Sequence, residues 1–246
     1  DYTVLEYVYK RSKEYNRAGG AMELVGLDVH DTSSQHPWSI HVHKPKKRTK
    51  LSRRQKDLQA FAHNNHWTFD PQLNWKTSYI EQYAFFASRP VEFEKNIING
   101  SYKDLNVNFH ISDLTFDEGA LLATEVYHTT VQIIELPFEI PVFSMEKEQF
   151  ADRVLELAGL GDIDFEKNDQ FSKNFLLHGD DKQAVTHFFN KKLRQFFLDH
   201  EIYHLESDGN SIMLFKYFRL ASFENLKKMI EFGHDLSQKL LESTEK

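Results

Sequence analysis

The dipeptide Asp208-Gly209 constrains the fold of this chain more than any other local feature. It stands between two apolar runs that favour β-strands, one ending at Leu205 and the other beginning near Ile212. Asp-Gly between such runs is a strong signal for a β-hairpin. A two-residue turn at this point pairs Leu205 with Ile212 and gives apolar cross-strand neighbours. The sequence therefore predicts a hairpin over residues 201–218.

The start of the same segment contains a string that is typical of zinc proteases, His-Glu-Ile-Tyr-His at residues 200–204. In such enzymes the string lies on a helix, where His200 and His204 bind zinc and Glu201 acts as the general base. On a strand, residues four apart are separated by about 13 Å, too far for two zinc–imidazole bonds of about 2 Å. The hairpin therefore argues against a zinc site. The alternative, a helix that continues through His204, stays open because helical apolar spacing extends that far.

Composition excludes several classes of protein. Among 246 residues there is no cysteine, which excludes disulfides, cysteine-based zinc sites and thiol catalysis. The balance of 40% hydrophobic and 27% charged residues is that of a globular protein, and a formal net charge of −7 opposes general nucleic-acid binding. The 21 phenylalanines predict an aromatic core. A small-ligand pocket lined by such rings is the alternative use for them.

The pattern along the chain divides it into an N-terminal segment with a basic linker, residues 1–50, and a domain at 51–246. Expected helices are 52–65, 146–157, 181–199 and 222–243. Expected strands are 21–29, 38–43, 67–69, 91–100, 102–112, 124–136, 140–145 and 171–177, with a turn at Asn99-Gly100. Asp181 is expected to cap the third helix. We therefore predict an α+β fold, an antiparallel β-sheet with helices packed on one face.

The basic run at residues 44–56 holds eight Lys or Arg before the first acidic residue, Asp57. Near an anionic membrane surface each such residue contributes about 1 kcal/mol. The candidate lipid-binding residues are Lys44, Lys46, Lys47, Arg48, Lys50, Arg53 and Arg54. A solvated linker in front of a helix is the alternative interpretation.

Several further motifs follow one another in a recognisable order. They are Gln59–Trp67, Asn96–Gly100, Thr129–Pro137 with Pro141, Ile163–Glu166, Phe171 with Phe175, and the hairpin at Gly209. Together they resemble an uncharacterised bacterial domain family that usually follows transmembrane helices. The family tends to have glycine before the tryptophan, where this chain has His66. Its membrane helices normally precede the basic run, and residues 1–43 contain none.

The resemblance implies a cytoplasmic domain held near a membrane, with no established reaction and no catalytic residues to transfer. It also implies that residues 201–205 form a strand. We therefore expect a non-catalytic interaction domain at the cytoplasmic face of a bacterial membrane. It would have an unknown protein partner, no cofactor, and an anchor outside this fragment, which begins at Asp1. The alternatives are a zinc-dependent hydrolase using His200, His204 and Glu201, and a small-ligand sensor domain.

Overall fold

A computed structural model describes residues 51–117, 126–147, 163–165, 169–201, 203–216 and 218–244. The chain divides into two compact units, residues 1–54 and 55–246. The features below belong to the second unit, apart from the start of the first helix. The strands expected at 21–29 and 38–43, and most of the basic run, lie outside the described residues. So does the helix expected at 146–157, except for its first two residues.

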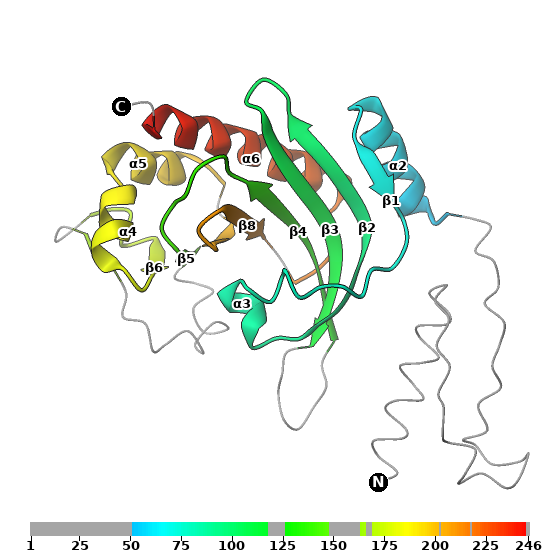
Figure 1. Ribbon diagram of the computed structural model, residues 1–246, viewed down its shortest axis with the longest axis horizontal. Coiled ribbons are helices and arrows are strands. Elements are labelled where there is room, and N and C mark those ends of the chain that lie inside the picture. Colours follow the sequence, from blue (N-terminus) through cyan, green and yellow to red (C-terminus); the bar gives the residue numbers. More distant parts are fainter. Residues whose placement is uncertain are drawn as a thin grey trace, which may run out of the picture. The chain divides into compact units, whose positions relative to one another are not determined.

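The second unit is built on one eight-stranded sheet, and every pairing in it is antiparallel. The strand order is β1-β2-β3-β4-β8-β7-β5-β6 (Figure 1). The strands are β1 (Thr68–Asp70), β2 (Val91–Tyr102), β3 (Val107–Asp117), β4 (Val126–Glu135), β5 (Phe143–Lys147), β6 (Phe175–His178), β7 (His204–Ser207) and β8 (Ser211–Phe215). The predicted α+β class is confirmed.

The helices lie on both faces of this sheet, in unequal amounts. They are α2 (Arg53–Asn64), α3 (Ala84–Ala87), α4 (Lys182–Phe188), α5 (Lys191–Asp199) and α6 (Phe223–Thr244). Four of them, α2, α4, α5 and α6, share one hydrophobic cluster and cover one face, as predicted. The four-residue α3 packs on the opposite face, in a second and smaller cluster.

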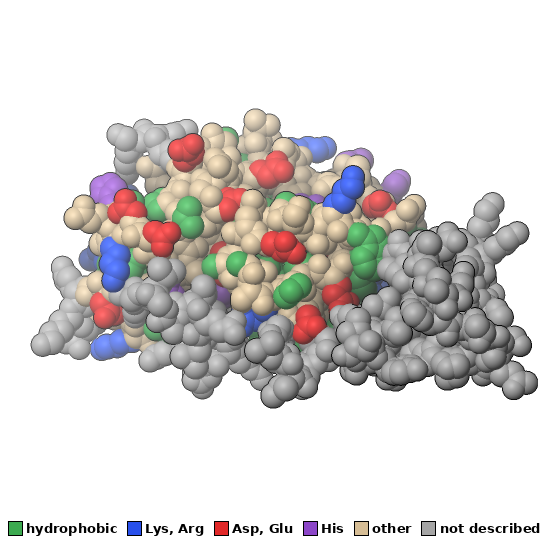
Figure 2. Space-filling view, turned by 60° about the horizontal axis from the view of Figure 1, so that its bottom comes forward, with side chains coloured by type: hydrophobic (Ala, Val, Ile, Leu, Met, Phe, Trp, Pro, Cys, Tyr) green, Lys and Arg blue, Asp and Glu red, His purple; other side chains and the backbone are tan. Residues whose placement is uncertain are grey.

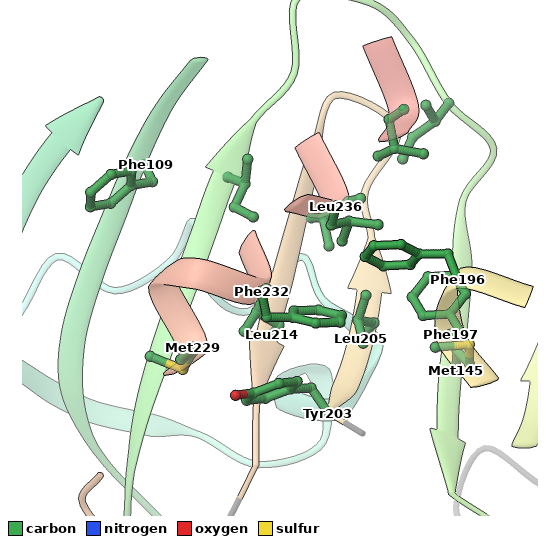
Figure 3. Packing of buried hydrophobic residues seen from close by; sticks show 14 of the residues in the cluster. Phe109, Met145, Phe196, Phe197, Tyr203, Leu205, Leu214, Met229, Phe232 and Leu236 are labelled. Atoms are coloured by element: carbon green, nitrogen blue, oxygen red, sulfur yellow. The ribbon is translucent and has the colours of Figure 1, made fainter. Parts of the chain in front are cut away.

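The larger cluster is filled from alternate strand positions and from one stripe of each helix. Figure 3 shows Phe232 and Leu236 of α6 packed over Leu205 and Leu214 of the hairpin. The strand residues point to this face because side chains alternate along a strand. The apolar stripe of α6 is buried at Leu226, Ile230, Leu236 and Leu240, whereas Phe223 is 39% exposed.

The smaller cluster holds α3 against the sheet. Phe85 and Phe86 of α3 are buried and contact the ring of Phe215 at centroid distances of 4.9 and 5.9 Å. The N-terminus of α3 has no side-chain cap from its own N-cap residue. Instead, the backbone N–H of Phe85 donates to both carboxylate oxygens of Glu206 in β7, at 3.0 and 3.1 Å. A carboxylate in this position satisfies a helix N–H and complements the helix dipole.

A hairpin is confirmed at His204–Phe215, inside the predicted 201–218, but its predicted register was wrong by two residues. Of the strand implied at 201–205, Glu201 and Tyr203 lie outside β7. Leu205 pairs with Leu214, not with Ile212. The turn is centred on Gly209-Asn210, because the Asp208 carboxylate accepts the backbone N–H groups of Asn210 and Ser211 at 2.9 and 2.7 Å. Asp208 therefore precedes the turn, as the acceptor of an Asx-turn. A shift of two residues leaves each side chain on its predicted face.

The turn predicted at Asn99-Gly100 was also wrong, since both residues lie inside β2. The chain reverses instead at residues 103–106, where Asn106 has φ of 53°. Gly100 serves packing, because a Cβ atom there would lie 2.5 Å from the Phe109 ring and 2.8 Å from Trp67. Glycine inside a strand often marks such a close approach.

Three further predictions differ from the structure, and local capping explains the first of them. The helix predicted at 181–199 is two helices, because Asn190 caps a new one by accepting the backbone N–H groups of Lys192 and Leu193. The cap predicted at Asp181 is confirmed. The strand predicted at 171–177 is confined to Phe175–His178. The helix predicted from residue 146 was wrong at its start, because Glu146 belongs to β5.

The end of α2 follows the prediction closely. The helix ends at Asn64, and the left-handed residue is His66, with φ of 60°. Trp67 N–H donates to Ala62 O and His66 N–H to His63 O, at 2.9 and 3.1 Å. This is the Schellman arrangement, in which the left-handed residue is usually glycine.

Candidate functional site

The α3 face of the sheet is covered only in part. Beyond the segment that carries α3, the ends of β2, β3 and β4 form the floor of an open groove of about 540 Å³, here called the β2–β4 groove. Its lining residues are His66, Trp67, Thr68, Tyr79, Gln82, Tyr83, Asn99, Gly100, Ser101, Asn108, Phe109, His110, Ile133, Glu135 and Ser211. This volume lies within the range of about 300–1,000 Å³ found for small-ligand sites.

One wall of the groove is held by a buried carboxylate. Glu94, on β2, is 1% exposed and accepts hydrogen bonds from Asn74 Nδ2 at 2.6 Å and from Tyr79 Oη at 2.7 Å. His110 Nε2 lies 3.0 Å from the same carboxylate. Burial alone raises the pKa of Glu94, but the hydrogen bonds from His110 and Tyr79 lower it by more. An ionised Glu94 therefore fastens the 74–79 segment to the sheet.

The groups that face the groove are oriented by this wall. The other ring nitrogen of His110, Nδ1, lies 2.9 Å from Asn99 Oδ1. Burial, and next the charge of Glu94, raise the pKa of the Tyr79 hydroxyl, so Tyr79 stays protonated and donates to the carboxylate. Burial likewise raises the pKa of Tyr83, whose Oη lies 2.5 Å from Ser211 Oγ. Each contact fixes one side chain of the lining.

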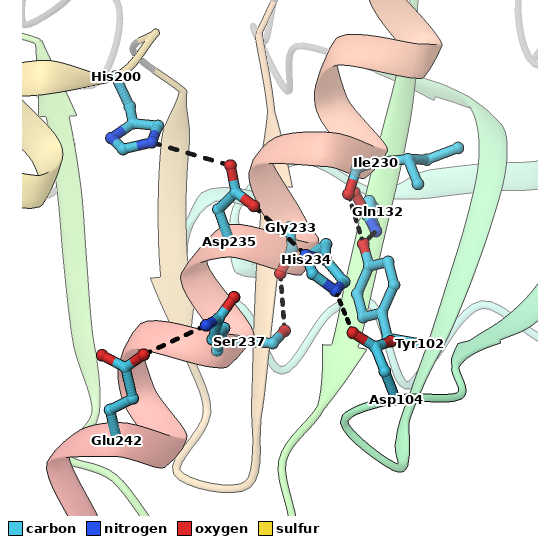
Figure 4. A network of polar contacts seen from close by, with 11 residues as sticks. Tyr102, Asp104, Gln132, His200, Ile230, Gly233, His234, Asp235, Ser237 and Glu242 are labelled. Atoms are coloured by element: carbon cyan, nitrogen blue, oxygen red, sulfur yellow. Dashed lines mark hydrogen bonds and ion pairs between the residues drawn. The ribbon is translucent and has the colours of Figure 1, made fainter.

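The two histidines of the 200–204 string lie at the ends of two different elements. His200 ends α5, with Nδ1 2.7 Å from Phe196 O and Nε2 3.9 Å from Asp235 of α6 (Figure 4). His204 lies in β7 on the opposite face, with Nε2 2.6 Å from Glu206 Oε1. Glu201 forms an ion pair with Lys216. The string therefore lacks the single helix that the zinc-protease geometry needs.

A buried acidic cluster around His204 was missed from the sequence. Glu146 of β5 is 3% exposed, and its Oε2 lies 3.8 Å from His204 Nδ1. Within the described part of the chain this oxygen accepts no hydrogen bond. Burial raises the pKa of the Glu146 carboxyl. The described residues nevertheless contain no group of three or more His, Asp or Glu arranged to hold a metal ion.

A second polar network lies beneath α6, on the other face of the sheet (Figure 4). Tyr102 Oη donates to Ile230 O at 2.8 Å and accepts from Gln132 Nε2 at 2.6 Å. Gly233 lies directly over this pair, because a Cβ atom there would be 2.5 Å from Tyr102 Oη. Both polar groups are buried, so the network fixes how closely α6 approaches the sheet.

Of the seven basic residues predicted to bind lipid, two fall in the described part of the chain. Arg53 and Arg54 form the first residues of α2, the former exposed and the latter half-buried. Lys44, Lys46, Lys47, Arg48 and Lys50 lie outside the described residues. Among the helices that the structure describes, none has the length and apolar character of a membrane-spanning segment.

Comparison with known proteins identifies no family for this chain. No protein-family model matches this chain, and no curated protein matches it. One solved structure that resembles it is the crystal structure of the mycobacterial trehalose monomycolate transport factor A. The two share 12% sequence identity and a TM-score of 0.47, over 74% of this chain and 93% of that one. At these values the match assigns neither a family nor a function to this chain.

Proposed function

We propose that this chain is a non-catalytic interaction domain that works at the inner face of a bacterial membrane. In this proposal the basic run at residues 44–56 contacts anionic lipid, and the acidic domain that follows presents the β2–β4 groove to a partner. The proposal includes membership of the bacterial domain family that the sequence motifs resemble. The observation that carries it is the separation of charge along the chain.

The charges of the two units have opposite signs. Residues 1–54 carry 11 Lys or Arg and 6 Asp or Glu, a formal net charge of +5. Residues 55–246 carry 19 Lys or Arg and 31 Asp or Glu, a net charge of −12. Figure 2 shows acidic side chains spread over the visible face of the second unit, with the basic ones mainly toward its margins.

This separation favours one mode of membrane contact. Anionic lipid attracts the basic run by about 1 kcal/mol for each Lys or Arg near the surface, and it repels the acidic unit. The field decays over a Debye length of about 8–10 Å at physiological salt. A domain of this charge is therefore held beside the membrane by its basic segment while its own faces stay free for a partner.

Flotation with liposomes tests the membrane part of the proposal. The chain is expected to float with vesicles that contain phosphatidylglycerol, and to be released by raised salt. Charge reversal at Lys46, Lys47 and Arg48 to Glu should abolish flotation. The matched control reverses three exposed lysines of the acidic unit, Lys173, Lys182 and Lys191, with the same change in net charge. Equal loss in both triple variants would show an effect of net charge alone and would refute the proposal.

A second candidate function, a small-ligand sensor, is favoured by the groove itself. The volume, the fixed wall at Glu94 and the oriented His110 are features of a preformed small-molecule site. The two functions are compatible, since a sensor domain at a membrane also needs a partner. They differ in whether a ligand or a protein occupies the groove.

A further inference from the structure

We propose that the β2–β4 groove binds an uncharged carbohydrate. This inference rests on the groove being the binding site of the proposed function, and it specifies the chemical class of the occupant.

The lining is dominated by neutral groups that both donate and accept hydrogen bonds. Exposed or half-exposed examples on the floor and rim are Thr68, Gln82, Asn99, Ser101 and Asn108. Sugar hydroxyls also donate and accept, so amide and hydroxyl side chains match them without burying charge. A site built to hydrogen-bond hydroxyl groups discriminates strongly against ligands that lack them.

Several of these groups are held in place before any ligand arrives. Asn99 is fixed by His110, which is fixed in turn by the buried Glu94. Gln82 Nε2 donates to Asp208 Oδ2 at 2.7 Å, and Asn108 Nδ2 to Glu135 Oε2 at 3.4 Å. Side chains that are already oriented lose less conformational entropy on binding.

The groove also has an apolar wall, against which the C–H faces of a sugar ring can pack. Trp67 lines it at the β1 edge and is half-buried. The indole makes T-shaped contacts with the rings of Phe61 and Phe109, at centroid distances of 5.5 and 4.9 Å. Apolar wall combined with a few placed polar groups is the usual composition of a small-molecule site.

Other ligand classes fit the lining less well. None of the described residues that line the groove is Lys or Arg, and Glu135 supplies a negative charge, so phosphates and carboxylates are disfavoured. A peptide that binds by strand addition pairs its main chain with an unpaired strand edge. The floor here is a sheet face, where β2, β3 and β4 already pair with one another.

Calorimetric titration, with NMR chemical-shift mapping, tests this proposal on the full chain without lipid. The probes are the neutral disaccharides maltose, cellobiose and sucrose. Glucose 6-phosphate and trialanine represent the anionic and peptide classes. Saturable binding of at least one neutral disaccharide is expected, with shifts at Asn99, Asn108 and His110. Asn108→Ala should weaken that binding about tenfold, because it removes one hydrogen-bonding group of the lining. The side chain is exposed, so its loss does not disturb the core.

Gln238→Ala is the matched control, since Gln238 is an exposed amide on α6, on the other face of the sheet. It should leave the affinity unchanged. No binding of any of the three disaccharides at millimolar concentration, or tighter binding of glucose 6-phosphate or trialanine, would overturn the carbohydrate assignment. That result together with intact, salt-sensitive flotation would refute this inference and leave the membrane proposal standing.

Discussion

Replacement of Gly233 by alanine probes the closest contact between α6 and the sheet. The new Cβ atom would lie 2.5 Å from Tyr102 Oη and 2.9 Å from Gln132 Nε2, closer than a Cβ atom can approach (Figure 4). Tyr102 cannot move freely, because it is 6% exposed and hydrogen-bonded to Gln132 and to Ile230 O. Either α6 lifts from the sheet or the buried hydrogen bonds break.

The cost follows from these contacts. Overpacking of a closed core costs about 1–3 kcal/mol. Loss of buried hydrogen bonds adds about 1–3 kcal/mol. The higher helix propensity of alanine offsets about 1 kcal/mol of this destabilisation. We therefore expect Gly233→Ala to lower the free energy of unfolding by about 1–5 kcal/mol, although alanine favours an isolated helix.

A double-mutant cycle separates this mechanism from a general defect. Tyr102→Phe removes the hydroxyl that the new Cβ atom would meet, so Gly233→Ala should cost at least about 1 kcal/mol less in that background. Urea denaturation of the full chain measures the four free energies. Strict additivity of the two substitutions, or a stabilising effect of Gly233→Ala alone, would refute the packing argument.

Three further predictions concern single residues. His66→Gly should stabilise the protein by about 1 kcal/mol in urea denaturation, because φ is 60° there, and His66→Ala should not. Burial raises the pKa of Glu146. Its contribution to the free energy of unfolding is therefore present at low pH and is lost as pH rises through the folded pKa. Glu146→Gln should flatten this part of the curve of unfolding free energy against pH. Asp104 raises the pKa of His234, so the stabilisation is present below pH about 6.5 and lost above the folded pKa. NMR titration of Asp104→Asn should show a lowered His234 pKa, and an unchanged value would contradict the pairing.

The parts of the fold that were predicted correctly depend on local periodicity. The helix from Arg53 and the α6 stripe follow a spacing of 3.6 residues, and the central strands follow a period of two. The parts that failed depend on contacts from distant residues. The local sequence at Gly100 predicts a turn, yet Gly100 accommodates Phe109 of β3 and Trp67, which precedes β1. The local sequence at Glu146 predicts the start of a helix, yet Glu146 lies in β5 and pairs with Leu176 of β6.

The candidate site was not predictable in the same way. Its wall joins Asn74, Tyr79, Glu94 and His110, which belong to a loop and two strands. No local spacing connects these residues, and only the register of β2 with β3 brings Glu94 and His110 together. The string at 200–204 is the opposite case. The local pattern of a zinc site is present, but the single helix that such a site needs is absent there.

Vesicle partitioning tests whether the basic segment holds the acidic domain at an anionic membrane. The bound fraction of the full chain is measured against the mole fraction of phosphatidylglycerol, at low and at physiological salt. We expect negligible binding to pure phosphatidylcholine, a steep rise with anionic lipid, and a shift of the curve to higher anionic content as salt increases. Equal binding to neutral and anionic vesicles, or binding that salt does not weaken, would show that the basic segment does not hold the domain at the membrane by charge.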